Sequence, residues 1–238
     1  MINILYNIRK GDINMEDNKI EVELRGFLPT KGERWRNLLI ELQKFWGMPS
    51  VTDELVIFFK YDKDIRLKIT KDGAFIIWKE RSEKNKSKFM LKEHIASISM
   101  DTVIDFVRIL DAIGYKEGLF SYCTRYDYKK GPYSFSIKLN SVCGDFFEID
   151  KKISNEKQIE SAKNELKYIL NKLKLRPWTD EEYDRHRKRS WSNVEKERLI
   201  YSDGTPNVKI KNIVCKYQNK THQSTNESVL ERLKKGIE

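Results

Sequence analysis

Long apolar runs are missing from this sequence of 238 residues. No segment approaches the roughly 20 apolar residues that a membrane-spanning helix needs. The N-terminus also lacks the apolar core and the small-residue cleavage site of a secretory signal peptide. We therefore expect a cytoplasmic protein with no membrane partner.

Cysteine and histidine are scarce as well, with three residues of each. No two cysteines share a C-x-x-C spacing, which argues against a disulfide framework and against a zinc site. The histidines are scattered and give no support for a nucleophilic triad. Redox, zinc and covalent nucleophilic chemistry are therefore not indicated by these residues.

Charge, in contrast, is abundant. Charged residues make up 34% of the chain, hydrophobic residues 39%, and the formal net charge is +10. The positive charge is dispersed along the chain rather than gathered into one basic block. This composition is typical of a soluble protein that binds anions.

Short strand-like segments dominate the first 150 residues. Apolar patterns predict strands in eight segments: 19–26, 54–61, 64–70, 74–80, 88–98, 115–128, 133–140 and 145–150. Amphipathic helices are predicted within 30–47, 100–114 and 155–173. Turn residues separate most neighbouring strands, which favours antiparallel pairing. We predict an α+β fold in which an eight-stranded antiparallel β-barrel carries helices on its outside.

The sequence divides into three parts. Residues 1–18 form an N-terminal extension, residues 19–175 hold the strands and the three helices, and residues 176–238 form a charged C-terminal extension. In this last part Thr179 and Glu182 have the spacing of a capping box for a short helix, and the turn residues SDGTPN indicate a hairpin. The extension can be a solvated appendage, a lid or a nucleic-acid contact.

Charged and aliphatic side chains alternate along the first strand segment. Successive side chains of a strand point to opposite faces, so Glu21, Glu23 and Arg25 share one face and the other face is aliphatic. The same alternation recurs in later segments and places further charged residues on one face: Arg66, Lys68, Lys79, Arg125, Lys138, Glu148 and Asp150. Several strands of this kind indicate one shared, strongly charged surface.

Two arrangements produce such a surface: an open sheet with a solvated face, or a closed barrel with a charged interior. The helices favour the barrel, because their apolar faces need the aliphatic strand faces as partners. Burying that much charge without partners costs many kcal/mol. We therefore expect the interior to bind an anion and, beside its acidic residues, metal ions.

The order of these motifs resembles the CYTH family, also called triphosphate tunnel metalloenzymes. The matching motifs are EVELR, the R-x-K of IRLK, the lysine of IIWKE, the arginine of RYDY and the closing GDFFEID, within residues 19–173. The resemblance implies an eight-stranded tunnel that binds a triphosphate through Arg and Lys and holds Mg²⁺ or Mn²⁺ with acidic residues.

The resemblance also assigns roles to individual positions. It implies that the metal ions bind Glu21, Glu23, Glu148 and Asp150. It implies that the phosphate groups bind Arg25, Arg66, Lys68, Lys79, Arg125 and Lys138. Glu21, Glu23 and Lys79 are the residues expected to matter most for catalysis.

Four positions depart from the family pattern. Arg25 replaces a usual Lys, Lys68 a common second Arg, and Asp150 a common Glu. These three keep their charge and change mainly the geometry, although Arg and Lys are not interchangeable where two parallel hydrogen bonds are needed. Asn140 replaces a usual Asp and so removes one negative charge.

The leading hypothesis is a metal-dependent triphosphatase that acts on tripolyphosphate or on an organic or nucleoside triphosphate. Carboxylates at positions i and i+2 of a strand lie about 7 Å apart and can share or serve metal ions that neutralise phosphate charge and position water. One alternative is a class IV-type adenylyl cyclase that makes cyclic AMP and pyrophosphate. Another is a non-catalytic binder of a triphosphorylated ligand or an RNA 5′ end, with the basic segment RHRKRSW contacting nucleic acid.

Overall fold

The computed structural model describes residues 20–29, 32–60, 64–81, 90–142, 144–192 and 195–218. The strands of this part are β1 (Ile20–Phe27), β2 (Ser50–Lys60), β3 (Asp64–Thr70), β4 (Gly73–Arg81), β5 (Met90–Ile98), β6 (Glu117–Lys130), β7 (Tyr133–Leu139), β8 (Phe146–Ile153) and β9 (Glu197–Arg198). The α-helices are α1 (Glu33–Trp46), α2 (Val103–Ala112), α3 (Ile159–Lys172), α4 (Asp180–Ser192) and α5 (Val208–Gln218). The extension predicted at 1–18 lies outside the described residues.

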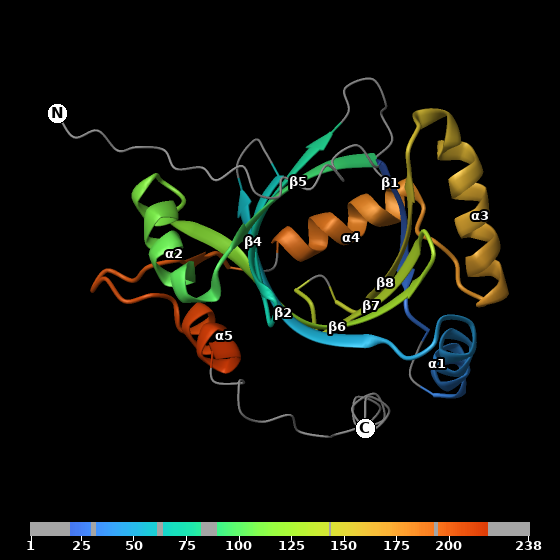
Figure 1. The fold of residues 1–238 in the computed structure, drawn as a ribbon, viewed down its shortest axis with the longest axis horizontal. Coiled ribbons are helices and arrows are strands. Elements are labelled where there is room, and N and C mark those ends of the chain that lie inside the picture. The colour runs from blue at the N-terminus through green and yellow to red at the C-terminus, as the bar shows by residue number, and fades with distance from the viewer. Residues whose placement is uncertain are drawn as a thin grey trace.

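Eight of the strands close into a ring. They follow the order β2-β3-β4-β5-β1-β8-β7-β6, and β2 pairs back onto β6. All of these pairings are antiparallel, and β9 adds a short edge to the start of β6. Figure 1 shows the ring with α1 and α3 on one side and α2 and α5 on the other. The predicted α+β fold with an eight-stranded antiparallel barrel is confirmed.

The aliphatic faces of β1, β7 and β8 pack outward against α1 and α3. Every second residue of β1 is buried here, because the alternation of the strand turns Val22 and Leu24 away from the barrel axis. The helices supply complementary stripes at helical spacing, among them Leu38, Leu42, Leu166 and Leu170. Each such side chain contributes about 1.5–3 kcal/mol of transfer free energy when buried.

A second apolar core covers the opposite side of the barrel. The outward residues of β2 and β3 meet α2 and α5 there, through Leu55, Ile57, Leu67, Ile69, Val103, Val107, Ile210 and Ile213. The aliphatic strand faces are therefore buried in the two outer cores. The charged strand faces are left to line the interior.

The C-terminal extension contributes to the second core and is not simply a solvated appendage. The predicted hairpin is reduced to a single bridge between Ile200 and Pro206. The chain then continues as the helix α5, where we predicted the second arm of the hairpin. The side-chain oxygen Oδ1 of Asn207 accepts a 2.9 Å hydrogen bond from the backbone N–H of Lys209 at the start of this helix.

Helix α4 differs from the other helices because it lies across the interior of the ring when the barrel is viewed as in Figure 1. It begins with the predicted capping box: the Glu182 N–H donates to Thr179 Oγ1 at 3.2 Å, and the Thr179 N–H donates to Glu182 Oε2 at 2.9 Å. The backbone N–H of Trp178 donates to the carbonyl of Arg25 at 2.7 Å. This bond ties the entry to α4 to the strand β1.

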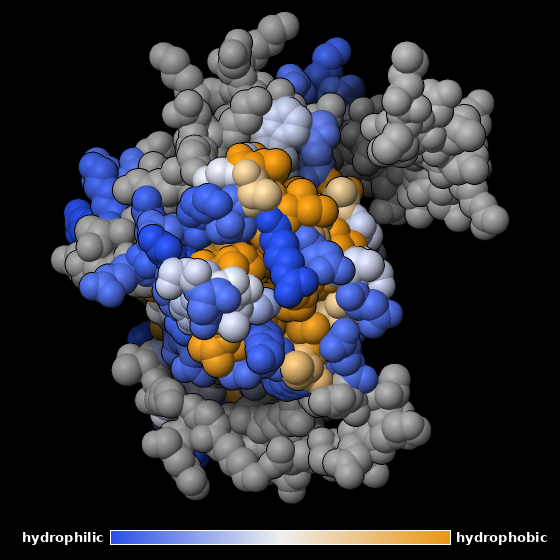
Figure 2. Space-filling model, turned by 90° about the vertical axis from the view of Figure 1, so that its left-hand side faces the viewer, coloured by the Kyte–Doolittle hydropathy of each residue, from blue (hydrophilic) through white to orange (hydrophobic). Residues whose placement is uncertain are grey.

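The face of the molecule on the α2 side interleaves hydrophobic and hydrophilic residues, as Figure 2 shows. Ile109 and Ile113 at the end of α2 are among the exposed hydrophobic residues. No helix in the described ranges is long and apolar enough to span a bilayer.

Replacing Gly26 by Ala should destabilise the protein. A Cβ atom at this position would lie 2.5 Å from the Arg176 carbonyl oxygen and 2.5 Å from the Phe147 ring, so β1 and the entry to α4 could no longer approach each other. Overpacking of this kind costs about 1–3 kcal/mol, which lowers the Tm by about 2–10 °C. Thermal unfolding measures the change, and an unaltered Tm would show that the 176–178 segment does not pack here.

Candidate functional site

The pairing register brings the predicted charged residues together in the barrel interior. Glu23 lies opposite Asp150 and Arg25 lies opposite Glu148 in the pairing of β1 with β8. Arg125 lies opposite Lys138 in the pairing of β6 with β7. The charged side of the barrel therefore follows the contiguous strands β3, β2, β6, β7, β8 and β1.

One group of contacts, which we call the β8 cluster, is centred on the Glu148 carboxylate and contains Glu23, Arg25, Lys138, Glu148 and Asp150. Arg25 Nε contacts Glu148 Oε1 at 2.8 Å, and Lys138 Nζ contacts Glu148 Oε2 at 2.6 Å. Arg25 Nε also donates to the Glu23 carboxylate. Burial by itself would raise the pKa of Glu148, but Arg25 and Lys138 outweigh it and hold that pKa below its ordinary value.

The pKa of Asp150 shifts in the opposite direction to that of Glu148. Burial first, and then the neighbouring carboxylates of Glu23 and Glu148, raise the pKa of Asp150 from 3.8 to about 7. Asp150 is 8% exposed, so water does little to relieve this repulsion. A group of carboxylates in this state gains stability when a cation comes between them.

The chemistry of the β8 cluster fits a hard divalent cation. Glu23, Glu148 and Asp150 supply carboxylate oxygens, the ligands that Mg²⁺ and Mn²⁺ prefer. Burial and then the repulsion from Glu23 and Glu148 raise the pKa of Asp150, and such an ion would reduce that repulsion. Among the described side chains, no three His, Cys, Asp or Glu are already arranged around one point as a metal site. Arg25 occupies two of the carboxylates, so metal binding requires these side chains to rearrange.

A second group of contacts, which we call the β6 cluster, contains Glu54, Lys68, Arg125, Asp127 and Ser136. Arg125 Nε donates to Asp127 Oδ1 at 2.6 Å and its second nitrogen donates to Ser136 Oγ at 3.2 Å, while Ser136 Oγ donates to Asp127 Oδ1 at 2.5 Å. Lys68 Nζ contacts Glu54 Oε2 at 2.7 Å, and Arg125 approaches the same oxygen at 3.9 Å. The cluster holds two predicted phosphate-binding cations in defined positions.

The remaining predicted site residues lie at different places around the ring. The Arg66 guanidinium lies over the Phe58 ring, 4.9 Å from its centroid. Glu21 lies opposite Lys152 near the start of β1. The backbone of Lys79 belongs to β4, but its side chain lies outside the described residues.

The departure at position 140 lies in the turn that follows β7. Asn140 is exposed, has a left-handed backbone with φ 60°, and donates its N–H to Asp145 Oδ1 at 2.8 Å. Asn adopts this conformation more readily than most residues. The structure thus gives Asn140 a role in turn geometry.

Three charged residues that we did not predict belong to the interior or its edge: Glu54, Asp127 and Lys152. Asp127 and Lys152 continue the alternation of Arg125 and Asp150, so extending each pattern by one step would have found them. Glu54 follows Asp53, and two adjacent acids in one strand do not reveal which of them faces inward.

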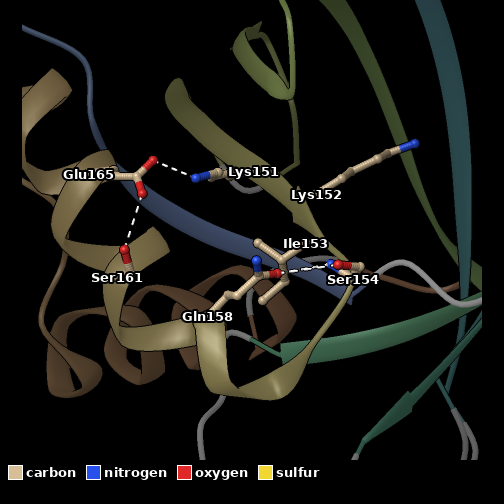
Figure 3. A pocket seen from close by; sticks show the side chains of 7 residues that line it. All are labelled: Lys151, Lys152, Ile153, Ser154, Gln158, Ser161 and Glu165. Atoms are coloured by element: carbon tan, nitrogen blue, oxygen red, sulfur yellow. Dashed lines mark hydrogen bonds and ion pairs between the residues drawn. The ribbon is translucent and has the colours of Figure 1, made fainter.

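The described pocket at the end of β8 lies outside the barrel, and Figure 3 shows its polar side chains turned towards one another. Glu165 on α3 accepts hydrogen bonds from Lys151 and Tyr133 at 2.5 Å each and from Ser161 at 3.2 Å. Lys152, the next residue along β8, points away from this group in Figure 3. The pocket is thus bordered by a hydrogen-bond network on the surface, and this network is separate from the two interior clusters.

Aromatic residues lie where the charged faces of β1 and β8 end. Phe27 and Phe146, which end the charged faces of β1 and β8, contact His186 of α4 with ring centroids 5.7 and 6.2 Å apart. The Tyr183 ring lies 5.7 Å from the Arg25 guanidinium carbon. Helix α4 therefore covers the interior beside the β8 cluster. The side chains of Arg187 and of residues 189–191 in the basic segment RHRKRSW lie outside the described residues.

Comparison with known proteins supports the fold. A candidate adenylate cyclase from Vibrio parahaemolyticus matches with a TM-score of 0.55 and 12% identity over 72% of this chain and 99% of that chain. The PH1819 protein from Pyrococcus horikoshii OT3 matches with a TM-score of 0.53 and 22% identity over 70% of this chain and 99% of that chain. The PH1012 protein from the same organism matches with a TM-score of 0.52 and 17% identity over 68% of this chain and 93% of that chain. No protein-family model and no curated protein matches the chain.

These matches define the class at the level of the fold. The chain shares the closed antiparallel barrel fold of these structures, which is the architecture that the resemblance of its motifs implied. At these identities the likeness shows the architecture alone.

Asp150→Asn should stabilise the metal-free protein at high pH. The folded-state pKa of Asp150 is about 7, against 3.8 for the ordinary group, so its stabilising contribution is complete below pH 3.8 and is lost as the pH rises through 7. The gain in Tm should be on the order of 5 °C at pH 8 and less than half as large at pH 5. Thermal unfolding in EDTA at both pH values measures it.

Asp105→Asn, which changes an exposed carboxylate on α2, is the matched control and should show no such dependence on pH. Equal gains at both pH values for Asp150→Asn would contradict the raised pKa that burial and the neighbouring carboxylates give Asp150.

Proposed function

We propose that this protein is a metal-dependent triphosphatase that hydrolyses inorganic tripolyphosphate or an organic triphosphate inside the barrel. The observation that carries the proposal is the β8 cluster, where Asp150 is held at a pKa of about 7 beside other carboxylates and beside Arg25 and Lys138. A metal ion would stabilise these carboxylates, and phosphate would stabilise the neighbouring basic side chains. The cluster therefore matches a triphosphate that carries a metal ion.

The cations of the two clusters would bind the phosphate chain. Arg25 and Lys138 now neutralise Glu148, and Lys68 and Arg125 now contact Glu54. A triphosphate would compete for these four groups with more negative charge than either carboxylate has. Asp127 and Ser136 hold the guanidinium of Arg125 at a fixed angle, which orients it for charge-assisted hydrogen bonds.

Glu21, Glu23, Glu148 and Asp150 would hold Mg²⁺ or Mn²⁺. The metal would neutralise phosphate charge and lower the pKa of a water molecule. Arg25, which now contacts Glu23 and Glu148, would bind the phosphate instead, and the buried residues around Asp150 would exclude bulk water. Lys79, assigned by motif resemblance, would bind phosphate. Neutralising the phosphate charge and positioning the reacting groups would together accelerate hydrolysis, as in other phosphoryl-transfer reactions.

A class IV-type adenylyl cyclase is the second candidate. The observation that favours it is the fold match to the candidate adenylate cyclase from V. parahaemolyticus. Cyclisation needs the same cations and metals, but a ribose hydroxyl replaces water as the nucleophile. The products separate the two reactions.

Product analysis tests the proposal. The purified protein is incubated with tripolyphosphate, ATP and thiamine triphosphate in Mg²⁺ and then in Mn²⁺. Orthophosphate that is lost on adding EDTA is the expected result. Cyclic AMP with pyrophosphate would overturn it in favour of the cyclase. Binding of triphosphate without turnover would identify a non-catalytic binder, and RNA with a 5′ triphosphate then becomes the ligand to compare, with its salt dependence.

Glu21→Ala and Glu23→Ala should each reduce kcat on the order of 100-fold or more while the protein stays folded, because each removes a proposed metal ligand worth several kcal/mol. Steady-state kinetics and circular dichroism provide the two readouts. Glu41→Ala on the outer surface of α1 serves as the control and should keep full activity. Wild-type kinetics in both interior variants would refute the metal assignment.

Lys79→Ala should raise the KM for tripolyphosphate about tenfold or more, because it removes one charged contact to phosphate. The KM is measured at saturating Mg²⁺. A KM that does not change would remove Lys79 from the binding site.

A further inference from the structure

Glu54 is a buried carboxylate within the proposed phosphate-binding region. It lies on β2, where the pairing with β6 places it opposite Cys123, and its side chain is 3% exposed. Its Oε2 contacts Lys68 at 2.7 Å, and its Oε1 accepts a hydrogen bond from the Cys123 thiol at 3.4 Å. An acidic residue inside an anion-binding region opposes the binding of the anion, so its presence needs a physical reason.

The neighbours of Glu54 give that reason. Lys68 and Arg125 both approach Glu54 Oε2, at 2.7 and 3.9 Å, and both are proposed to bind phosphate. Without an anion these cations would repel each other in a space of low polarity. Glu54 neutralises part of this repulsion while the protein has no ligand. Arg125 has a second anchor in Asp127, but Glu54 is the carboxylate that the structure shows in contact with Lys68.

We propose that Glu54 is a positioning residue that acts as an internal competitor of the triphosphate: it holds Lys68 and Arg125 in place in the empty tunnel and limits how tightly the phosphate chain can bind them. This inference rests on the proposed triphosphate site and adds a residue that neither the motifs nor the resemblance assigned.

Magnitudes decide the direction of the expected effect. A carboxylate about 5 Å from a bound phosphate charge opposes binding by about 3 kcal/mol at an effective dielectric constant near 20. In the variant, the phosphate must itself order a lysine that Glu54 no longer holds, which costs at most about 2 kcal/mol of side-chain entropy. The electrostatic effect is larger, so removing the charge of Glu54 should tighten binding even though Lys68 becomes less ordered. Turnover should slow for two reasons. The cations that bind the phosphate are then less well oriented, and the more tightly bound phosphate is released more slowly.

The test is binding of tripolyphosphate to the full-length protein in EDTA, measured by calorimetry, so that the readout does not depend on catalysis. Glu54→Gln should lower the Kd about fivefold or more. With metal present, the KM and the kcat should both fall. Glu54→Asp keeps the charge and should restore a Kd within about twofold of the wild type. Glu41→Gln, which removes one charge from the surface of α1, should leave the Kd unchanged.

A second comparison applies if Glu54→Gln does not fold, since a buried cation would lose its partner. Lys68→Gln alone should weaken binding, whereas the double variant Glu54→Gln/Lys68→Gln removes the ion pair as a unit and should bind more tightly than Lys68→Gln. A double variant that binds no more tightly than Lys68→Gln would overturn the proposal.

The outcomes separate this inference from the proposed function. If the wild type binds tripolyphosphate and Glu54→Gln binds it equally or more weakly, the role of Glu54 is refuted and the triphosphate site stands. If the folded wild type binds no tripolyphosphate either in EDTA or in saturating Mg²⁺, the proposed function fails and the role of Glu54 fails with it.

Discussion

The closed barrel depends on the pairing of charges in its interior. Arg25 and Lys138 neutralise the Glu148 carboxylate from two sides, at 2.8 and 2.6 Å, and thereby allow three ionised groups to be buried together. Buried charges without such partners cost several kcal/mol each, which is comparable to the whole stability of a domain. The polar faces of β1, β7 and β8 can therefore turn inward because Arg25 lies opposite Glu148 and Lys138 reaches the same carboxylate.

The outer faces of the barrel supply the stability that the interior does not. Two separate apolar cores, one under α1 and α3 and one under α2 and α5, bury the aliphatic sides of the strands. These outer cores therefore supply the favourable apolar burial, while the paired charges inside limit the cost of burying charge. The interior side chains can be strained electrostatically, as the raised pKa of Asp150 shows, and this condition suits a site that binds a charged ligand.

Much of the architecture followed from the alternation of residue types. The segment containing Glu21, Glu23 and Arg25 predicted a strand with one charged and one aliphatic face, and the amphipathic segments predicted the helices that cover the aliphatic faces. Glu54 was not predicted, because the adjacent Asp53 made the inward face ambiguous. The helix α5 was not predicted either, since its apolar residues follow a turn that resembled the middle of a hairpin.

The sequence by itself determined which side of each strand carries charge, because a strand alternates its side chains whatever its partners are. Only the tertiary structure decided which charges meet. The antiparallel register sets Arg25 beside Glu148, and the closure of β2 onto β6 brings Glu54 near Arg125, residues that are distant in the chain. The position of α4 across the interior was likewise decided by contacts with Arg25, Phe27 and Phe146, because local sequence specifies that a helix forms but not what it covers.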